Sequence, residues 1–345
     1  MAPQSTSVIL DTYWPHLIRL SDNLRALSFP LMKAFPAAHC VARALERGDL
    51  KPGNLVVETS SGTMALGLAV VCRLMEFPLA IVSDSACDEP LRRRMEDLGA
   101  TVERVSITSG GNYQAARLNR VREICESTPG SWWVNQYDNP SNAEAYVPIA
   151  QDLMRAPGRI DCLVGAVGSG GSMSGLARCL RRRFPSMRVV GVDTGGSVLF
   201  GQPEGPRPLR GLGNSLVPRN LDHTQFDEIH WVSAAEAYTA TRLLHQQTTL
   251  YRGGTSGACW MVASHWARLH AESQTICVFP DEGHRYAESI YNDDYLHRNS
   301  LWLGCLPAVP VEAPDPGAVT TRWSSFQWAR RTLADVTASV HSMVS

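Results

Sequence analysis

Short apolar runs rich in valine, isoleucine and leucine alternate with helix-length segments along most of the chain. Such runs, bounded by small or polar residues, are typical of buried strands, and the longer segments between them have the spacing of helices. This alternation indicates an α/β protein with mainly parallel sheets. The predicted strands are 55–58, 79–82, 101–105, 132–134, 162–167, 188–192, 228–232 and 275–279; the predicted helices are 63–75, 89–98, 114–126, 173–183, 234–247, 258–269 and 323–339.

Two proline-rich or glycine-rich segments interrupt this pattern. Residues 201–210 are predicted to form a surface loop, and residues 306–317, with four prolines, a linker to the last helix.

Three predicted turns between a strand and the following helix are rich in glycine, serine and threonine. A helix N-terminus leaves N–H groups unpaired and carries a partial positive charge, so such turns are natural anion sites. Residues 168–172 (Gly-Ser-Gly-Gly-Ser) suit a phosphate, although a plain tight turn explains them too. Residues 60–62 either hold a substrate carboxylate or contain the cap of the next helix, at Ser61. Residues 253–258 leave the same two interpretations open.

The first of these turns also resembles part of a dinucleotide fingerprint. Gly168 and Gly170 follow a strand, and Asp193 ends the next strand, where a ribose-binding acid would lie. Met173 occupies the third glycine position, so the match is partial.

Composition narrows the class of protein. The 345 residues are 44% hydrophobic and 19% charged, which is typical of a globular protein with two domains. A net charge of −1 gives no general attraction to nucleic acid or acidic membranes. No apolar run is long enough to span a membrane and no signal peptide is recognised. The nine cysteines lack metal-ligand spacing, so we expect no metal, buried reduced thiols and a cytoplasmic location.

Only two of the 32 basic residues are lysines. Lys33 lies among Leu31, Met32 and Phe35, and an apolar site lowers the pKa of an amine, as a Schiff-base lysine requires. The alternative is an apolar stem with its charged end in water. Lys51 lies in a polar turn and is expected to face solvent.

Seven segments follow one another in a recognisable order: Lys33 with the Lys-Pro-Gly turn at 51–53, and residues 58–62, 135–142, 168–172, 211–218, 254–257 and 280–286. Together they resemble motifs of the cysteine synthase/cystathionine β-synthase family, the fold-type II pyridoxal phosphate (PLP) enzymes. The resemblance covers residues 17–296. Through residues 133–137, 192–193, 196–201 and 290–296 it is closest to the siderophore-pathway branch, the synthases of N-(2-amino-2-carboxyethyl)-L-glutamate.

The resemblance implies a tryptophan synthase β-like fold of two three-layer αβα domains with the cofactor between them. It further implies a smaller, mobile domain at 40–140, a larger PLP-binding domain at 1–39 plus 141–299, and a C-terminal extension at 300–345. A homodimer is implied as well.

The resemblance also assigns roles to residues. Lys33 would be the catalytic lysine that holds PLP, and Thr255 would bond the pyridine nitrogen. Thr63 stands where the family has an asparagine that bonds the cofactor. The cofactor phosphate would be bound by Gly168, Ser169, Gly170, Gly171 and Ser172, and the substrate carboxylate by Ser60, Ser61, Gly62, Thr63 and Gln136.

Two departures from the family pattern surround the reacting carbon. Lys33 is followed by Ala34 and Phe35 rather than Asp-Arg, and Met64 and Ala65 replace Thr-Gly.

The implied reaction is PLP-dependent β-replacement on O-phosphoserine or O-acetylserine through an aminoacrylate. The nucleophile would be an amine such as glutamate or a thiol, in siderophore or other secondary-metabolite amino-acid biosynthesis. A cysteine synthase or a β-eliminating lyase or dehydratase is the first alternative. A non-catalytic regulatory or binding subunit is the second. Small amino acids are the expected partners, without nucleic acid or membrane.

Overall fold

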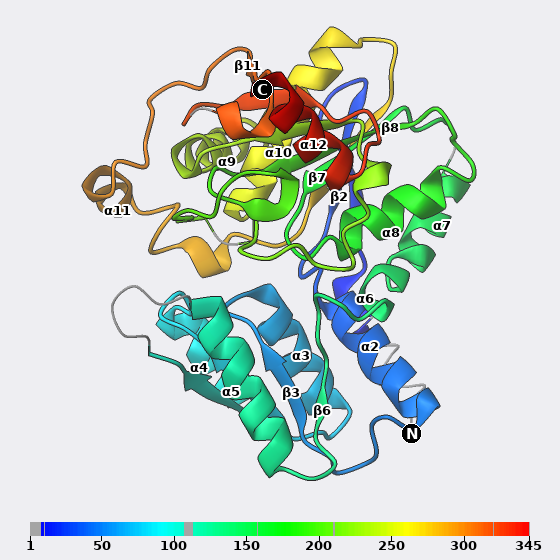
Figure 1. Ribbon diagram of the computed structural model, residues 1–345, viewed down its shortest axis with the longest axis vertical. Helices are drawn as coiled ribbons and strands as arrows, with labels where there is room; N and C mark the ends of the chain where they lie inside the picture. Colours follow the sequence, from blue (N-terminus) through cyan, green and yellow to red (C-terminus); the bar gives the residue numbers. More distant parts are fainter. Residues whose placement is uncertain are drawn as a thin grey trace. The chain divides into compact units, whose positions relative to one another are not determined.

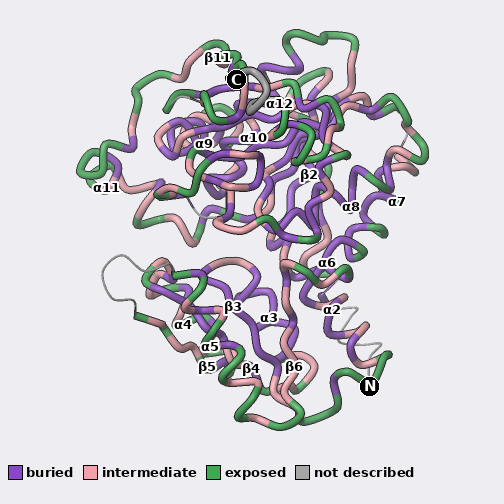
Figure 2. The backbone as a smooth tube through the Cα atoms, viewed as in Figure 1, coloured by how far each residue is buried: buried purple, intermediate pink, exposed green. Residues whose placement is uncertain are grey.

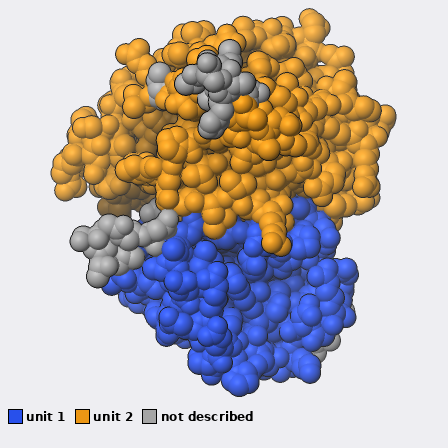
Figure 3. All heavy atoms as spheres, viewed as in Figure 1, with its two compact units in different colours: residues 1–14, 30–146 blue, residues 15–29, 147–345 orange. Residues whose placement is uncertain are grey.

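The computed structural model describes residues 8–9, 11–106, 113–156, 158–209, 211–319 and 321–344 (Figure 1). The chain divides into two compact units (Figure 3). Unit 1 comprises Met1–Trp14 and Pro30–Tyr146, and unit 2 comprises Pro15–Phe29 and Val147–Ser345.

The described part of unit 1 contains a four-stranded sheet in the order β5-β4-β3-β6, with every neighbouring pair parallel. Parallel neighbours need crossover connections, which the helices between the strands provide. The strands are β3 (Val56–Thr59), β4 (Leu79–Ser83), β5 (Ala100–Arg104) and β6 (Trp132–Trp133); the helices are α2 (Ala34–Arg47), α3 (Thr63–Leu74), α4 (Glu89–Asp97), α5 (Tyr113–Ser127) and α6 (Ser141–Glu144).

Both faces of the unit 1 sheet are covered. Val56 and Ile81 pack with the buried faces of α2, α3 and α4, whereas the adjacent Val57 and Val82 pack with Val121 of α5. Successive strand residues point to opposite faces, so this division defines a helix–sheet–helix sandwich. Figure 2 shows β3 and α3 as buried, and the predicted substrate turn connects the end of β3 to the start of α3.

The described part of unit 2 contains an eight-stranded sheet in the order β1-β2-β10-β7-β8-β9-β12-β11. The pairs from β2 through β9 are parallel, whereas β1 and β12 join their neighbours antiparallel. This agrees with the prediction of mainly parallel sheets. The strands are β1 (His16–Arg19), β2 (Leu24–Ser28), β7 (Cys162–Ala166), β8 (Arg188–Asp193), β9 (Glu228–Trp231), β10 (Thr275–Phe279), β11 (Val311–Glu312) and β12 (Ser324–Gln327).

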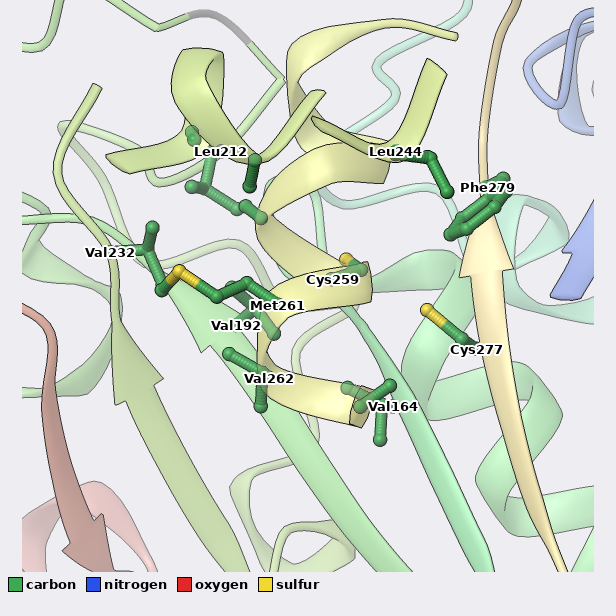
Figure 4. Packing of buried hydrophobic residues seen from close by; sticks show 14 of the residues in the cluster. Val164, Val192, Leu212, Val232, Leu244, Cys259, Met261, Val262, Cys277 and Phe279 are labelled. Atoms are coloured by element: carbon green, nitrogen blue, oxygen red, sulfur yellow. The ribbon is translucent and has the colours of Figure 1, made fainter. Parts of the chain in front are cut away.

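The core of unit 2 lies between this sheet and α10. Val164 and Val192 of the sheet pack with Cys259 and Val262 of α10 (Figure 4). On the strand next to α10, Leu163 is also buried but points to the opposite face, and α8 contacts the same strand. The helices are α7 (Val147–Arg155), α8 (Gly171–Leu180), α9 (Ala234–Thr248), α10 (Gly254–Leu269), α11 (Asp293–Arg298) and α12 (Leu333–Val344), with 3₁₀ turns at Val198–Phe200, His223–Gln225, His284–Tyr286 and Pro316–Ala318.

The predicted helix at 323–339 is wrong in its first half. Residues Ser324–Gln327 form β12, which pairs antiparallel with β9, and α12 begins only at Leu333. Trp323 and Trp328 flank this strand and are fully buried, so sheet pairing and aromatic burial override the helical pattern. The predicted turn at 253–257 is also shorter than expected, because α10 already begins at Gly254.

The nine cysteines all lie in described ranges and all are free thiols. Seven are buried, as predicted, while Cys125 is half-buried and Cys305 is exposed. Within the described ranges no helix is long and apolar enough to cross a membrane. No group of three or more His, Cys, Asp or Glu side chains in those ranges is arranged to hold a metal ion.

Candidate active site

Lys33 lies in unit 1, immediately before the first residue of α2, with helical backbone angles. Its neighbours Leu31, Met32 and Phe35 are buried. Desolvation of the amine lowers the pKa of Lys33 to about 8, against the opposing influence of Cys40 and Glu58. An amine with this pKa is partly deprotonated near neutral pH, which makes it available as a nucleophile and as a base.

A glycine lets α3 approach the backbone of Lys33. A Cβ atom on Gly67 would lie 2.6 Å from the carbonyl oxygen of Lys33. That distance is below any real contact, so a larger residue at this position would displace the lysine. The sequence pattern predicted α3 but gave no sign of this contact.

The turn between β3 and α3 contains the residues predicted to bind the substrate carboxylate. The Oγ of Ser60 accepts hydrogen bonds from the N–H groups of Gly62 (3.2 Å) and Ala65 (3.3 Å). Thr63 is the first residue of α3, so the partial positive charge of the helix N-terminus lies at this turn. The interpretation of Ser61 as the cap of the helix is wrong, because Ser60 accepts these bonds.

Ser61 instead belongs to a buried ion-pair network. Its hydroxyl donates to Asp84 Oδ1 (2.8 Å) and accepts from Arg117 Nη1 (2.7 Å). Arg117 also lies 3.5 Å from Asp84 Oδ2, and the two side chains are 9% and 2% exposed. Neither Asp84 nor Arg117 was predicted from the sequence. The one available signal was a polar residue directly after a buried strand, which describes Asp84.

Gln136 lies beside the same turn. Its Nε2 donates to the carbonyl oxygen of Thr59 (3.1 Å), and its backbone N–H donates to Glu58 Oε2 (3.0 Å). Both Glu58 and Gln136 are buried. The structure therefore joins Gln136 to the two residues that directly precede the turn at 60–63, although they are more than 70 residues apart in the sequence.

The predicted phosphate turn lies in unit 2, between β7 and α8. Gly170 has a left-handed backbone (φ +78°), and a Cβ there would lie 2.6 Å from Leu221 Cα, so only glycine fits. Helix α8 begins at Gly171, and Ser169 and Ser172 are buried beside its N-terminus. Backbone N–H groups, two hydroxyls and the helix dipole make this turn suited to a phosphate.

Thr255 and the phosphate turn both lie close to Gly211. A Cβ on Gly211 would be 3.2 Å from the methyl group of Thr255, and a Cβ on Gly168 would be 3.3 Å from the carbonyl oxygen of Gly211. Asn214 Nδ2 donates to the carbonyl oxygen of Gly168 (3.3 Å) and fixes this loop. The hydroxyl residue predicted for the pyridine nitrogen and the predicted phosphate turn therefore share one neighbour.

The alternative of a dinucleotide site lacks its ribose-binding acid. Asp193 is fully buried, and its Oδ1 accepts the N–H of Thr194 (2.8 Å). A carboxylate committed to the adjacent backbone in this way does not present itself to a ribose hydroxyl.

The residues present fit pyridoxal phosphate. Residues 168–172 offer a phosphate site in which a Cβ at Gly170 would not fit. Thr255 offers a hydroxyl at the start of α10, and Lys33 an amine of lowered pKa.

Comparison with known proteins agrees with this chemistry. A family model described as "Pyridoxal-phosphate dependent enzyme" matches residues 22–281. The chain is 38% identical to an N-(2-amino-2-carboxyethyl)-L-glutamate synthase of Ralstonia nicotianae, over 82% of this chain and 87% of that one. It is 37% identical to a synthase of the same name from Cupriavidus metallidurans, over 77% and 80% of the two chains.

Solved structures share the fold. The O-acetylserine dependent cystathionine beta-synthase of Helicobacter pylori superposes with a TM-score of 0.75 at 24% identity, covering 81% of this chain and 97% of that one. This likeness confirms the predicted fold class of two α/β units.

Proposed function

The chain belongs to the family of pyridoxal-phosphate dependent enzymes, and from this premise we propose that it replaces the phosphate of O-phosphoserine with the amine of glutamate. It is an enzyme, and pyridoxal phosphate is its cofactor. The observation that carries the reaction is the similarity to two synthases of this type over most of both chains. The lowered pKa of the Lys33 amine and the close approach of α3 to the backbone of Lys33 support it.

The proposed reaction balances without a further reactant. The Cβ–O bond of O-phosphoserine breaks and inorganic phosphate leaves with the electron pair. A Cβ–N bond forms to the amine of glutamate, which loses one proton, while the α-proton removed in the first half is returned in the second. The products are N-(2-amino-2-carboxyethyl)-L-glutamate and phosphate.

The chain's own residues divide this work. When bound, pyridoxal phosphate withdraws electrons from the α-carbon of the amino acid. We propose that Lys33 holds the cofactor and that its Nζ, once free, takes the α-proton and later returns it. Ser60, Ser61, Gly62, Thr63 and Gln136 orient the α-carboxylate, which sets the direction of proton removal. Gly168, Ser169, Gly170, Gly171 and Ser172 hold the cofactor phosphate, with Thr255 at the ring nitrogen.

A substrate screen tests this function. The cofactor-loaded protein is supplied with O-phosphoserine or O-acetylserine as donor and with glutamate, sulfide or homocysteine as acceptor, and products are identified by mass spectrometry. We expect the glutamate conjugate and one phosphate per turnover. Cysteine or cystathionine as the main product would contradict the amine acceptor, and pyruvate alone would contradict β-replacement. Cofactor binding without turnover of any pair would favour a regulatory subunit.

Matched lysine variants identify the catalytic amine. Lys33→Ala should abolish turnover, whereas Lys51→Ala, at an exposed position in a polar turn, should keep it. Equal turnover in both variants would contradict the role of Lys33.

The proposal also covers the pathway, the oligomeric state, the location in the cell and a domain movement. We propose that the enzyme supplies a siderophore precursor, acts as a homodimer in the cytoplasm, and moves residues 40–140 as its smaller domain on substrate binding. Light scattering tests the dimer, and loss of siderophore production in a deletion strain, restored by the synthase product, tests the setting.

A further inference from the structure

Glu58, the residue before the last one of β3, carries a carboxylate that is completely buried in unit 1. Each carboxylate oxygen accepts a backbone hydrogen bond: Oε1 from Thr59 N (2.6 Å) and Oε2 from Gln136 N (3.0 Å). Desolvation raises the pKa of Glu58 to about 7, so burial of this acid carries a free-energy cost. Because burial of this acid is unfavourable, packing alone does not explain a glutamate at this position.

The two hydrogen bonds join the two segments predicted to bind the substrate carboxylate. Thr59 begins the turn that contains residues 60–63, and Gln136 follows β6, the neighbour of β3 in the sheet. Two further bonds complete the arrangement: Gln136 Nε2 donates to Thr59 O (3.1 Å), and Asn142 Nδ2 donates to Gln136 O (2.6 Å). The distance between the turn and Gln136 is therefore set through Glu58.

An ionised glutamate has the two acceptor atoms and the length that these two backbone hydrogen bonds need. Two backbone N–H groups point at it, so both of its terminal atoms must accept. A glutamine keeps the size but turns one terminal atom into a donor, which would face an N–H group. An aspartate keeps both acceptors but is one methylene too short to reach both segments.

We propose that Glu58 is a positioning residue of the β-replacement reaction, holding residues 60–63 and Gln136 at the spacing that binds the α-carboxylate of the donor amino acid. This inference rests on the proposed function, which assigns the carboxylate to these residues. It predicts an effect confined to the half-reaction of the donor, because the acceptor attacks only after the donor is in place.

The test separates kcat/KM for the donor from kcat/KM for the acceptor in Glu58→Gln. We expect kcat/KM for O-phosphoserine to fall about tenfold or more, the size expected for loss of one hydrogen bond to a charged group. The value for glutamate should stay within about twofold. A purely structural role lowers the amount of active protein and therefore reduces both values equally, and that result would overturn the proposal.

Glu236→Gln is the matched control. Glu236 is also a buried glutamate that accepts backbone hydrogen bonds, from Ser233 N (2.9 Å) and Trp323 N (2.7 Å). These contacts belong to the start of α9 and the C-terminal segment of unit 2. We expect this variant to lower the melting temperature and leave kcat/KM for O-phosphoserine unchanged.

A binding measurement keeps the inference separate from the proposed function. Calorimetric titration of the cofactor-loaded protein with L-serine, which carries the same α-carboxylate, should show a dissociation constant about tenfold weaker in Glu58→Gln than in the wild type. If the wild type makes no conjugate with any acceptor, the proposed function fails while this comparison still decides the role of Glu58. Unchanged L-serine binding would overturn that role.

Glu58→Asp covers the case in which Glu58→Gln does not fold. It retains the charge and both acceptors, and should show the same loss of kcat/KM for O-phosphoserine without a loss for glutamate.

Combination with Gln136→Ala adds a second check, because the effect of Glu58→Gln should shrink once the Gln136 side chain is absent. Full additivity of the two changes would contradict action through Gln136.

Discussion

At the scale of single residues, the charged amine of Lys33 is expected to destabilise the folded protein. Its pKa falls from 10.5 to about 8 through desolvation, so the folded protein holds its proton less tightly than the unfolded chain. Stability therefore rises with pH between about 8 and 10.5, and below about 8 the full penalty of the buried charge is present.

Removal of this charge should change the free energy of unfolding by a measurable amount. Lys33→Met should stabilise the cofactor-free protein at pH 7, by on the order of 1–3 kcal/mol. The gain should disappear above pH 10.5, where both states of the wild type carry a neutral amine. Denaturant unfolding at the two pH values measures it, with exposed Lys51→Met as the control. A gain that is equal at both pH values would exclude the buried charge as its cause.

The sequence predicted the turn at residues 60–62 but not the partners of its serines. Ser60 accepts the helix N–H groups, whereas Ser61 binds Asp84 and Arg117. These partners come from the residue directly after β4 and from the first half of α5, which meet only once the sheet is formed. Local spacing specifies which residue types lie at a turn; the choice between two adjacent hydroxyls depends on tertiary contacts.

At the scale of elements, strands that form a clear apolar run were predictable, and strands without one were not. The strand at 275–279 was predicted with its observed ends, because four apolar residues follow Thr275 and both faces are buried. The edge strand β1 has the sequence His-Leu-Ile-Arg and is largely exposed, so it lacks the apolar signal. The sequence analysis likewise did not predict β2, α2 or α7.

The C-terminal segment is an integral element of unit 2. Trp323 and Trp328 are fully buried, and Trp323 Nε1 donates to His230 Nδ1 (2.8 Å). The ring of Trp328 packs edge-on against Phe200. This segment pairs with β9, whose edge it covers, so it contributes to the stability of the sheet.

Trp328→Ala tests this contribution. Removal of a buried tryptophan leaves a cavity and should cost about 3–5 kcal/mol of unfolding free energy. Val309→Ala, at a position 64% exposed in the same segment, should change stability by less than about 0.5 kcal/mol. Chemical denaturation measures both. Similar small effects would show that the segment is dispensable for the stability of unit 2.

At the scale of the whole molecule, the class of fold was predictable from the sequence. The expected division was residues 40–140 as the smaller domain, residues 1–39 plus 141–299 as the larger one, and residues 300–345 as an extension, and this division stays a prediction. Clustering of the structure gives Met1–Trp14 with Pro30–Tyr146 as one unit and Pro15–Phe29 with Val147–Ser345 as the other. Residues 15–29 join the second unit because β2 pairs with β10, some 250 residues away, and no local pattern encodes that partner.

Cofactor binding links one turn to the stability of the entire protein. A ligand that binds only the folded state raises the melting temperature, and at a given concentration a tighter ligand raises it more. Pyridoxal phosphate should therefore raise the melting temperature of the wild type, and pyridoxal, which lacks the phosphate, should raise it less. The difference between the two ligands measures what the phosphate turn contributes.

Gly170→Ala should remove most of that difference. A Cβ at Gly170 meets Leu221 Cα at 2.6 Å, and the backbone there is left-handed (φ +78°), so the turn must distort. Gly48→Ala is the matched control, because Gly48 has almost the same backbone angle (φ +77°) but open space around it. Both variants carry the strain of alanine in this conformation, of about 1 kcal/mol, and only Gly170→Ala crowds the turn.

We expect the apparent affinity for pyridoxal phosphate to fall at least about tenfold in Gly170→Ala and to stay at the wild-type value in Gly48→Ala. An unchanged stabilisation by pyridoxal phosphate in both would place the phosphate elsewhere than at residues 168–172.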